Sequence, residues 1–353
     1  MVVTYLIGNG FDVNLGLPTK YSDYYQEYLE GIKNLDDSNP DNKMIKEFWD
    51  KIKDEIFDKW KDFEEALAIN LDGDESNVRA VLRDFTIKFS AYLKRVSNGF
   101  ECTDEVTDNF RDFLINGFST IIRRDKNILS QYQIGGPNDF VIQFINFNYT
   151  DSLEKIITNY KNRYGSLKIS EKRINSYTYT ATIKSDVFHL HGSLNPDDYV
   201  IIGIDSTEQF TNDTLKTNPN TEKYCVKSKI NQAAGYSDRE RDFVSLINAS
   251  NIIYTYGVSF GKTDKLRWDV IKKWLETSGT HRLVAYEYGS GINAHNSPYI
   301  QDTLDYIDNK KREVMKNICV EETDYDKYLE QIFVIDSDDV LNCKFTKREE
   351  VTT

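Results

Sequence analysis

The feature that most limits what this chain can fold into is an apolar run at its start that stops at a glycine turn. Residues 2–7 (VVTYLI) are β-branched, aromatic or aliphatic, and a Gly-Asn-Gly sequence follows them. Such a run predicts a buried strand that leads into a tight turn. A backbone without Cβ atoms lets a phosphate approach, and amide N–H groups with the following helix dipole would neutralise its charge. The predicted phosphate-binding residues are Gly8, Asn9, Gly10, Phe11 and Asp12. The alternative is a turn that only joins a strand to a helix.

Strand and helix signals alternate again in the second part of the chain. We predict strands at 140–145, 187–190, 199–204, 251–256, 282–286 and 333–335. Helices are predicted at 151–160 and 262–276, and the polar stretch 207–220 reads as a loop. This alternation predicts an α/β fold with a Rossmann-like, mostly parallel sheet and helices on both faces. Ligands of such sheets bind beyond the carboxyl ends of the strands.

Between these two parts the pattern is helical. Apolar residues recur at spacings of three and four among many lysines and acidic residues, which is typical of amphipathic helices. We therefore predict a Rossmann-like domain formed by 1–30 and 138–345, a helical insertion at 31–137 that closes at a Gly-Gly-Pro turn (135–137), and a frayed tail at 346–353.

Composition excludes several classes of protein. A net charge of −13 argues against affinity for nucleic acid, because nucleic-acid binders carry a basic face. The four cysteines stand far apart without a C-x-x-C pair, which argues against a zinc module and fits a reducing compartment. The start shows no secretory signal, and no apolar run reaches the ~18 residues of a membrane span. These features predict a cytoplasmic protein with no membrane association.

Two short polar motifs follow predicted strands. Asn148 and Tyr149 lie in the sequence INFNYTD, where Asn148 could direct its amide at a ribose or a water molecule. The alternative is an asparagine that tolerates an awkward backbone angle or caps a helix. His189 and His191 lie in HLHG, and strand alternation would place them on one face. A metal pair is conceivable there, but no third ligand with suitable spacing is present, so we predict no metal site. His191, beside glycine at the strand end, is the candidate general acid or base, and His189 the structural residue.

A fourth motif, YGVSFGKTD, follows the predicted strand at 251–256. Its Gly257, Ser259 and Gly261 match the G-x-S-x-G spacing of a nucleophile elbow. A serine hydrolase would then use Ser259 with His281 or His295. That reading leaves the other three motifs unexplained. The structural alternative is a plain strand-to-helix turn, in which Asp264 starts the helix.

Taken in order, the four motifs resemble the AbiH family of phage abortive-infection proteins. The resemblance rests on LIGNGFD with LGLPT and YSD near the start, then FNYT followed by Leu153-Glu154, HLHG, and YGVS with Asp264. It spans roughly residues 2–270. The family is in turn similar to the sirtuin-like fold, which binds NAD.

The resemblance implies functional roles for individual residues. Asn148 matches the asparagine that positions water or ribose, and His191 matches the catalytic histidine. The remaining matches are the phosphate turn around Gly8 and Gly10 and a later NAD-contacting turn at Gly257 and Ser259. Tyr149 and Asp264 complete the expected nucleotide-binding set. The missing four-cysteine zinc module argues against protein deacetylation. Related zinc-free defence proteins typically cleave NAD, so the activity that the resemblance implies is hydrolysis of NAD to nicotinamide and ADP-ribose. The alternative is a non-catalytic nucleotide-binding sensor. A homo-oligomer and a phage-derived trigger are the implied partners.

Overall fold

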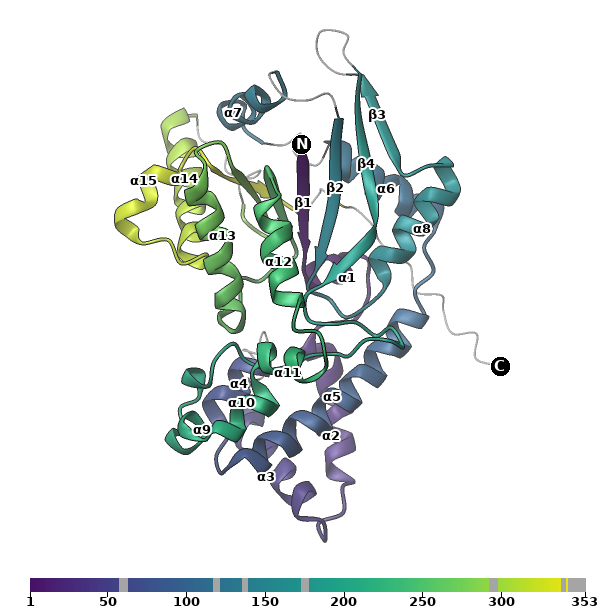
Figure 1. The fold of residues 1–353 in the computed structure, drawn as a ribbon, viewed down its shortest axis with the longest axis vertical. Coiled ribbons are helices and arrows are strands. Elements are labelled where there is room, and N and C mark those ends of the chain that lie inside the picture. The colour runs from purple at the N-terminus through teal and green to yellow at the C-terminus, as the bar shows by residue number, and fades with distance from the viewer. Residues whose placement is uncertain are drawn as a thin grey trace.

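A computed structural model of the chain describes residues 1–56, 63–116, 121–134, 139–172, 178–291, 298–337 and residue 341. The predicted turn at 135–137, the tail at 346–353 and His295 lie outside the described residues. Figure 1 shows the sheet in the upper part of the molecule and a group of helices below the carboxyl ends of its strands.

The sheet contains seven strands in the order β3-β4-β2-β1-β5-β6-β7. All neighbouring pairs are parallel except β3 and β4. Counted along the chain, the six parallel strands therefore lie in the order 3-2-1-4-5-6, which is the Rossmann order. The strands are β1 (Val2–Ile7), β2 (Asp139–Asn146), β3 (Lys168–Lys172), β4 (Thr178–His189), β5 (Ile252–Tyr256), β6 (Arg282–Glu287) and β7 (Ile332–Asp336). The predicted α/β fold with a mostly parallel sheet is confirmed.

Helices cover both faces of this sheet. The residues of β1 alternate: Tyr5 and Ile7 join a core with α6 and α8, whereas Leu6 joins a core with α12, α13 and α14. The bounds are α1 (Asn9–Asn14), α6 (Asp104–Asn116), α7 (Arg123–Ile134), α8 (Ser152–Tyr164), α12 (Arg239–Asn248), η3 (Lys262–Asp264), α13 (Lys265–Thr277), α14 (Ile300–Asn317), η4 (Glu322–Asp324) and α15 (Tyr325–Tyr328).

The remaining described helices form the group below the sheet in Figure 1. They are α2 (Tyr21–Lys33), α3 (Pro40–Ile56), α4 (Phe63–Asn70), α5 (Glu75–Asn98), η2 (Thr207–Gln209), α9 (Asp213–Thr217), α10 (Pro219–Cys225) and α11 (Lys227–Ala233). Aromatic residues of α2 to α5 share one hydrophobic core with Ile202, Ile204, Phe210, Leu215 and Cys225. We call this group the helical layer. It is built from two segments of the chain, whereas the buried residues of α6 pack against the sheet.

Two predictions about the second segment are wrong. The apolar stretch 199–204 is not a strand. Ile201 donates its N–H to the carbonyl of His191, and Ile204 donates its N–H to the carbonyl of Cys225. These are isolated hydrogen bonds to two different segments, not the continuous ladder of a strand pair. The polar stretch 207–220 is not a loop, because it contains η2, α9 and the start of α10. Asn212 and Asn218 explain the helix starts, since their side chains accept hydrogen bonds from the first turns of α9 and α10.

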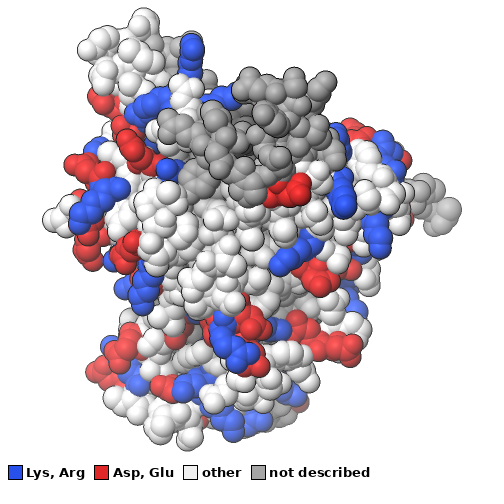
Figure 2. Space-filling model, turned by 45° about the horizontal axis from the view of Figure 1, so that its top comes forward, with Lys and Arg blue, Asp and Glu red and all other residues white. Residues whose placement is uncertain are grey.

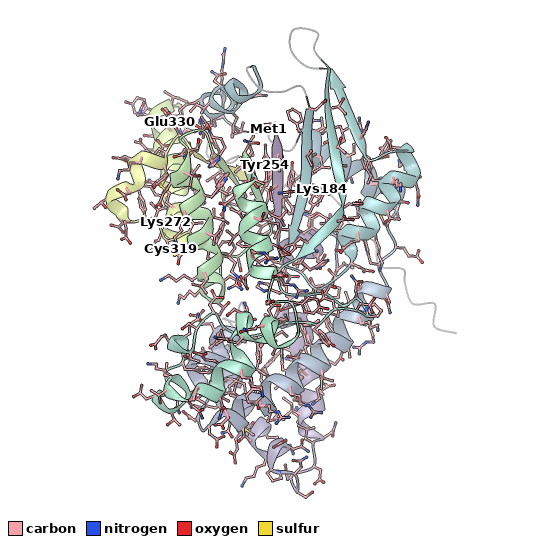
Figure 3. All side chains as sticks on the ribbon, viewed as in Figure 1. Met1, Lys184, Tyr254, Lys272, Cys319 and Glu330 are labelled. Carbon is pink, nitrogen blue, oxygen red and sulfur yellow. The ribbon has the colours of Figure 1, made fainter. Side chains whose placement is uncertain are left out.

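On the face shown in Figure 2, lysine and arginine are interspersed with aspartate and glutamate rather than gathered in one basic area. Among the described helices, none combines the length and the apolar character that crossing a membrane would require. Figure 3 shows that side chains fill the region where the carboxyl edge of the sheet meets the helical layer.

Candidate functional site at the carboxyl edge of the sheet

The four motifs meet at one edge of the sheet. The strands β4, β2, β1 and β5 are neighbours in this order, and each motif begins where one of them ends. Because β1 has β2 on one side and β5 on the other, the chain changes direction at β1. This is the switch point at which α/β sheets commonly bind ligands.

The glycine turn after β1 packs against the turn after β5. Gly8 donates its N–H to the carbonyl of Tyr256 at 2.9 Å, and Gly10 donates to that of Gly257 at 2.9 Å. A Cβ atom on Gly8 would lie 2.4 Å from the Gly257 carbonyl oxygen, so a larger residue would push the turns apart. The Phe11 N–H is also used, by the carbonyl of Gly8, and α1 has only six residues. The phosphate-binding role of this turn stays a prediction, and in this arrangement these three N–H groups already have partners.

The other residues of the turn have structural contacts. Asn9 bonds Thr19 twice: its Oδ1 accepts from the hydroxyl at 2.6 Å and its Nδ2 donates to the carbonyl at 3.2 Å. The Phe11 ring is fully buried, with its edge against Tyr256. Asp12 is fully buried and accepts hydrogen bonds from Thr150 at 2.6 Å and Ser152. Burial raises the pKa of Asp12 to about 6. Asp12 therefore ties α1 to the start of α8.

Asn148 reaches across to β1. Its side chain is buried, and Nδ2 donates to the carbonyl of Gly8 at 3.1 Å. Its own N–H donates to Oδ1 of Asn146 at 3.0 Å. Tyr149 points toward the helical layer, where its hydroxyl donates to the carbonyl of Ile201 at 3.2 Å, and burial raises its pKa. These bonds fix the Asn148 loop at the switch point.

The two histidines have different partners, contrary to the prediction that they share a face. The strand β4 ends at His189, so the alternation does not continue to His191. His189 contacts the Asn148 carbonyl through Nδ1 at 2.9 Å and Glu154 of α8 through Nε2 at 2.5 Å. Burial alone would lower the pKa of His189, but its hydrogen bond and charge interaction with Glu154 raise it. The assignment of His189 as a structural residue stays a prediction.

His191 lies on the side of η3. It is 5% exposed, and its ring stands edge-on to Phe147. Its Nε2 lies 3.1 Å from Oδ1 of Asp264. Burial lowers the pKa of His191 to about 4, more than the charge of Asp264 can offset. His191 is therefore neutral at pH 7 and can accept a proton.

Sequence reasoning missed a buried ion-pair cluster beside His191. The Nζ atom of Lys227, the first residue of α11, lies 3.0 Å from Oδ1 of Asp264 and 2.8 Å from Oε2 of Glu64 in α4. Burial disfavours the ionised form of Asp264, but the positive charge of Lys227 outweighs this effect and holds the pKa of Asp264 well below its usual range. The two carboxylates likewise raise the pKa of Lys227 although burial lowers it. No motif marks Lys227 or Glu64, because each is one charge in a strongly charged stretch.

The serine-hydrolase alternative does not fit the described residues. Ser259 is exposed beyond the carboxyl end of β5. His281 precedes β6 at the opposite edge of the sheet, and the six residues of this strand span roughly 20 Å. Its Nδ1 contacts the carbonyl of Trp274 at 2.7 Å. Ser259 and His281 therefore cannot form a catalytic pair.

The structure thus brings His191 and Asp264 into contact and places Asn148 against Gly8, while Gly257 supports the glycine turn. Ser259 is the expected nucleotide contact that remains exposed. Within the described ranges, no group of three or more His, Cys, Asp or Glu side chains is arranged to hold a metal ion.

Comparison with known proteins agrees with the motif pattern. No curated protein is similar enough to count as a relative. A family model described as bacteriophage abortive infection AbiH matches residues 4–286, which is well over half of the chain. The match includes all four motifs at the carboxyl edge. The chain therefore belongs to the bacteriophage abortive infection AbiH family.

Proposed function

We propose that this protein is an abortive-infection effector that hydrolyses NAD to nicotinamide and ADP-ribose at the carboxyl edge of its sheet. Its family indicates a role in phage abortive infection. The observation that carries the proposal is His191: a buried histidine that is neutral at pH 7 lies at the switch-point edge beside the ionised Asp264. A neutral imidazole can accept a proton, and the neighbouring carboxylate offsets part of the cost of burying the charge that the imidazole then carries.

The reaction needs one water molecule and one base. The bond between nicotinamide and the ribose breaks, and nicotinamide leaves with the bonding electrons. Water adds to the ribose carbon, and its proton passes to His191. Asp264 then offsets part of the cost of the buried positive charge on the imidazole. Asn148 positions the water or the ribose, and its place beside Gly8 keeps it at this edge.

The phosphate contacts of NAD have a second candidate source beside the predicted glycine turn, which is Ser259. The N–H groups of Gly8, Gly10 and Phe11 already donate to backbone carbonyls. Ser259 is exposed just after β5, next to the switch point, so its hydroxyl is accessible to a ligand. We therefore propose that Ser259 supplies a contact to the pyrophosphate in addition to the predicted glycine turn.

The experiment that tests the proposal is incubation of the purified protein with NAD and chromatography for nicotinamide. We expect His191→Gln to reduce release by about 10²–10⁴, the range for loss of a general base. Asn148→Ala should also reduce it. The matched control is His281→Gln, which changes the same residue type at the opposite edge and should retain full activity. Normal release by His191→Gln would overturn the assignment.

A second candidate is a nucleotide sensor that does not turn over its ligand. The observation in its favour is that the amide of Asn148 and the N–H groups of the glycine turn are bonded within the protein. Binding of NAD in a calorimetric titration, without nicotinamide release, would support the sensor. Under either proposal the ligand is a nucleotide, and a phage-derived trigger and a homo-oligomer are the partners that we propose.

A further inference from the structure

The buried cluster beside His191 links two parts of the molecule. Lys227 is 1% exposed, and its ammonium group contacts Asp264 at 3.0 Å, Glu64 at 2.8 Å and the carbonyl of Thr263 at 3.3 Å. Glu64 belongs to α4 in the helical layer, whereas Asp264 belongs to η3 at the edge of the sheet. The three contacts occupy the three donors of the ammonium group.

Lys227 and His191 approach the same atom. Both Lys227 Nζ, at 3.0 Å, and His191 Nε2, at 3.1 Å, lie next to Oδ1 of Asp264. The charge available to stabilise a proton on His191 therefore depends on how far Lys227 neutralises this carboxylate. The position of Lys227 is fixed in turn by Glu64, whose other oxygen accepts the N–H of Gly203 at 2.8 Å.

We propose that Lys227 is a positioning residue of this site: it holds the Asp264 carboxylate against His191 and keeps His191 neutral, while Glu64 anchors it to the helical layer. This inference rests on the proposed role of His191. It adds a residue that contacts neither substrate nor reacting atoms, and it makes protonation of His191 depend on the packing of the helical layer against the sheet.

The charged groups that act on His191 come from several elements. They are Asp264 of η3, Lys227 of α11 and Arg267 of α13, together with their own partners Glu64 of α4, Asp205 and Glu240 of α12. Removing the ammonium group would leave Asp264 to act on His191 alone. The His191–Asp264 pair should then keep its proton to higher pH, because an uncompensated carboxylate favours the imidazolium.

The test is the titration of His191 in Lys227→Met, followed by NMR of carbon-13-labelled histidine from about pH 5 to about pH 8. The signal is assigned by its loss in His191→Gln. The wild-type signal should stay in its neutral position over this range. In Lys227→Met the pKa of His191 should rise by about 1 to 3 and the titration should become visible. Lys227→Arg, which keeps the positive charge, should behave as the wild type.

The chain offers a matched control for the loss of a buried lysine. Lys311 is also 1% exposed and pairs with the buried Asp125 at 2.9 Å, away from the motifs at the carboxyl edge. Lys311→Met should lower stability but leave the His191 titration unchanged. An unshifted His191 signal in Lys227→Met, or an equal shift in Lys311→Met, would overturn the proposal.

A folding failure also decides the question. If Lys227→Met and the more polar Lys227→Gln both fail to fold while Lys311→Met folds, Lys227 is a residue of the fold alone and the proposal is wrong. The titration needs no catalytic activity, so a protein that does not cleave NAD would refute the proposed function and leave this test intact. Where nicotinamide is released, the acid limb of its pH profile should move upward in Lys227→Met only.

Discussion

At the scale of single residues, His191 makes the stability of the protein depend on pH. Its ordinary pKa of 6.5 applies to the unfolded chain, and burial lowers the pKa to about 4 in the folded protein. Between these values the unfolded state binds more protons, so the free energy of unfolding falls as the pH falls through this window. Above pH 6.5 His191 is neutral in both states, so the free energy of unfolding is not reduced. Below about pH 4 the loss reaches its maximum of about 3 kcal/mol.

We therefore expect His191→Gln to lose less stability than the wild type when the pH is lowered through this window. Urea unfolding at several pH values measures the difference. Other groups also titrate in this window, so the comparison is between variants at each pH. His281→Gln is the control and should follow the wild type. Parallel loss of stability in His191→Gln and the wild type would show that His191 is not held neutral by the fold.

The sequence allowed part of this site to be predicted. His191 and Asp264 stand in short motifs that follow apolar runs, and the carboxyl ends of parallel strands must meet at one edge. Lys227 could not be found in this way, because a buried lysine differs from an exposed one only through its partners. The ligand contact predicted for Asp12 stays a prediction, and nothing in the sequence indicated that its partners within the protein would be Thr150 and Ser152.

At the scale of elements, the contact between the β1 and β5 turns explains two glycines without any ligand. Gly8 has an extended backbone that any residue can adopt, so only the lack of space requires glycine there. Gly257 has a positive φ of 67° and also faces the backbone of Gly10, so both conformation and space require glycine. A phosphate-binding turn and a close turn-to-turn contact give the same sequence pattern.

We expect Gly8→Ala to destabilise the protein by about 1–3 kcal/mol, the usual range for an overpacked site, and to reduce ligand binding because the turns separate. The matched control is Gly31→Ala in α2, where a Cβ atom meets nothing within 4 Å. That change should stabilise the helix by about 0.5–1 kcal/mol. Thermal unfolding measures both. A Gly8→Ala protein as stable as the wild type would show that the two turns are not in tight contact.

The strand predictions were right where a neighbouring strand is present to accept and donate the backbone hydrogen bonds. The run 2–7 became β1 because it is apolar and lies between two parallel neighbours. The run 199–204 is equally apolar but has no neighbouring strand among the residues that the structure describes, and Ile202 and Ile204 pack into the helical layer instead. An apolar pattern predicts burial in both cases, and only the tertiary partner determines whether a strand forms.

At the scale of the whole molecule, the helical layer joins segments that are far apart in sequence. Phe85 of α5 is fully buried against Phe63 and Trp49, in the core that also contains Ile204 and Phe210. The sequence pattern predicted helices between 31 and 137 but gave no sign that residues after 200 complete their core. Lys227 is the first residue of α11, which belongs to this second segment. The helical layer therefore contributes a residue to the surroundings of His191.

We expect Phe85→Ala to weaken both segments of the helical layer together, since deleting a buried phenylalanine costs about 3–5 kcal/mol. In native-state hydrogen exchange, protection should fall in α2 to α5 and also in α9 to α11, while β2 and β5 retain theirs. Phe333→Ala is the matched control, because Phe333 is equally buried in the core of the sheet, in β7. It should reduce protection in β6 and β7 and leave α2 to α5 unchanged. If Phe85→Ala affected α2 to α5 but not α9 to α11, the two segments would not be one cooperative unit. The contacts from Glu64 through Lys227 to His191 would then not depend on the shared core of the helical layer.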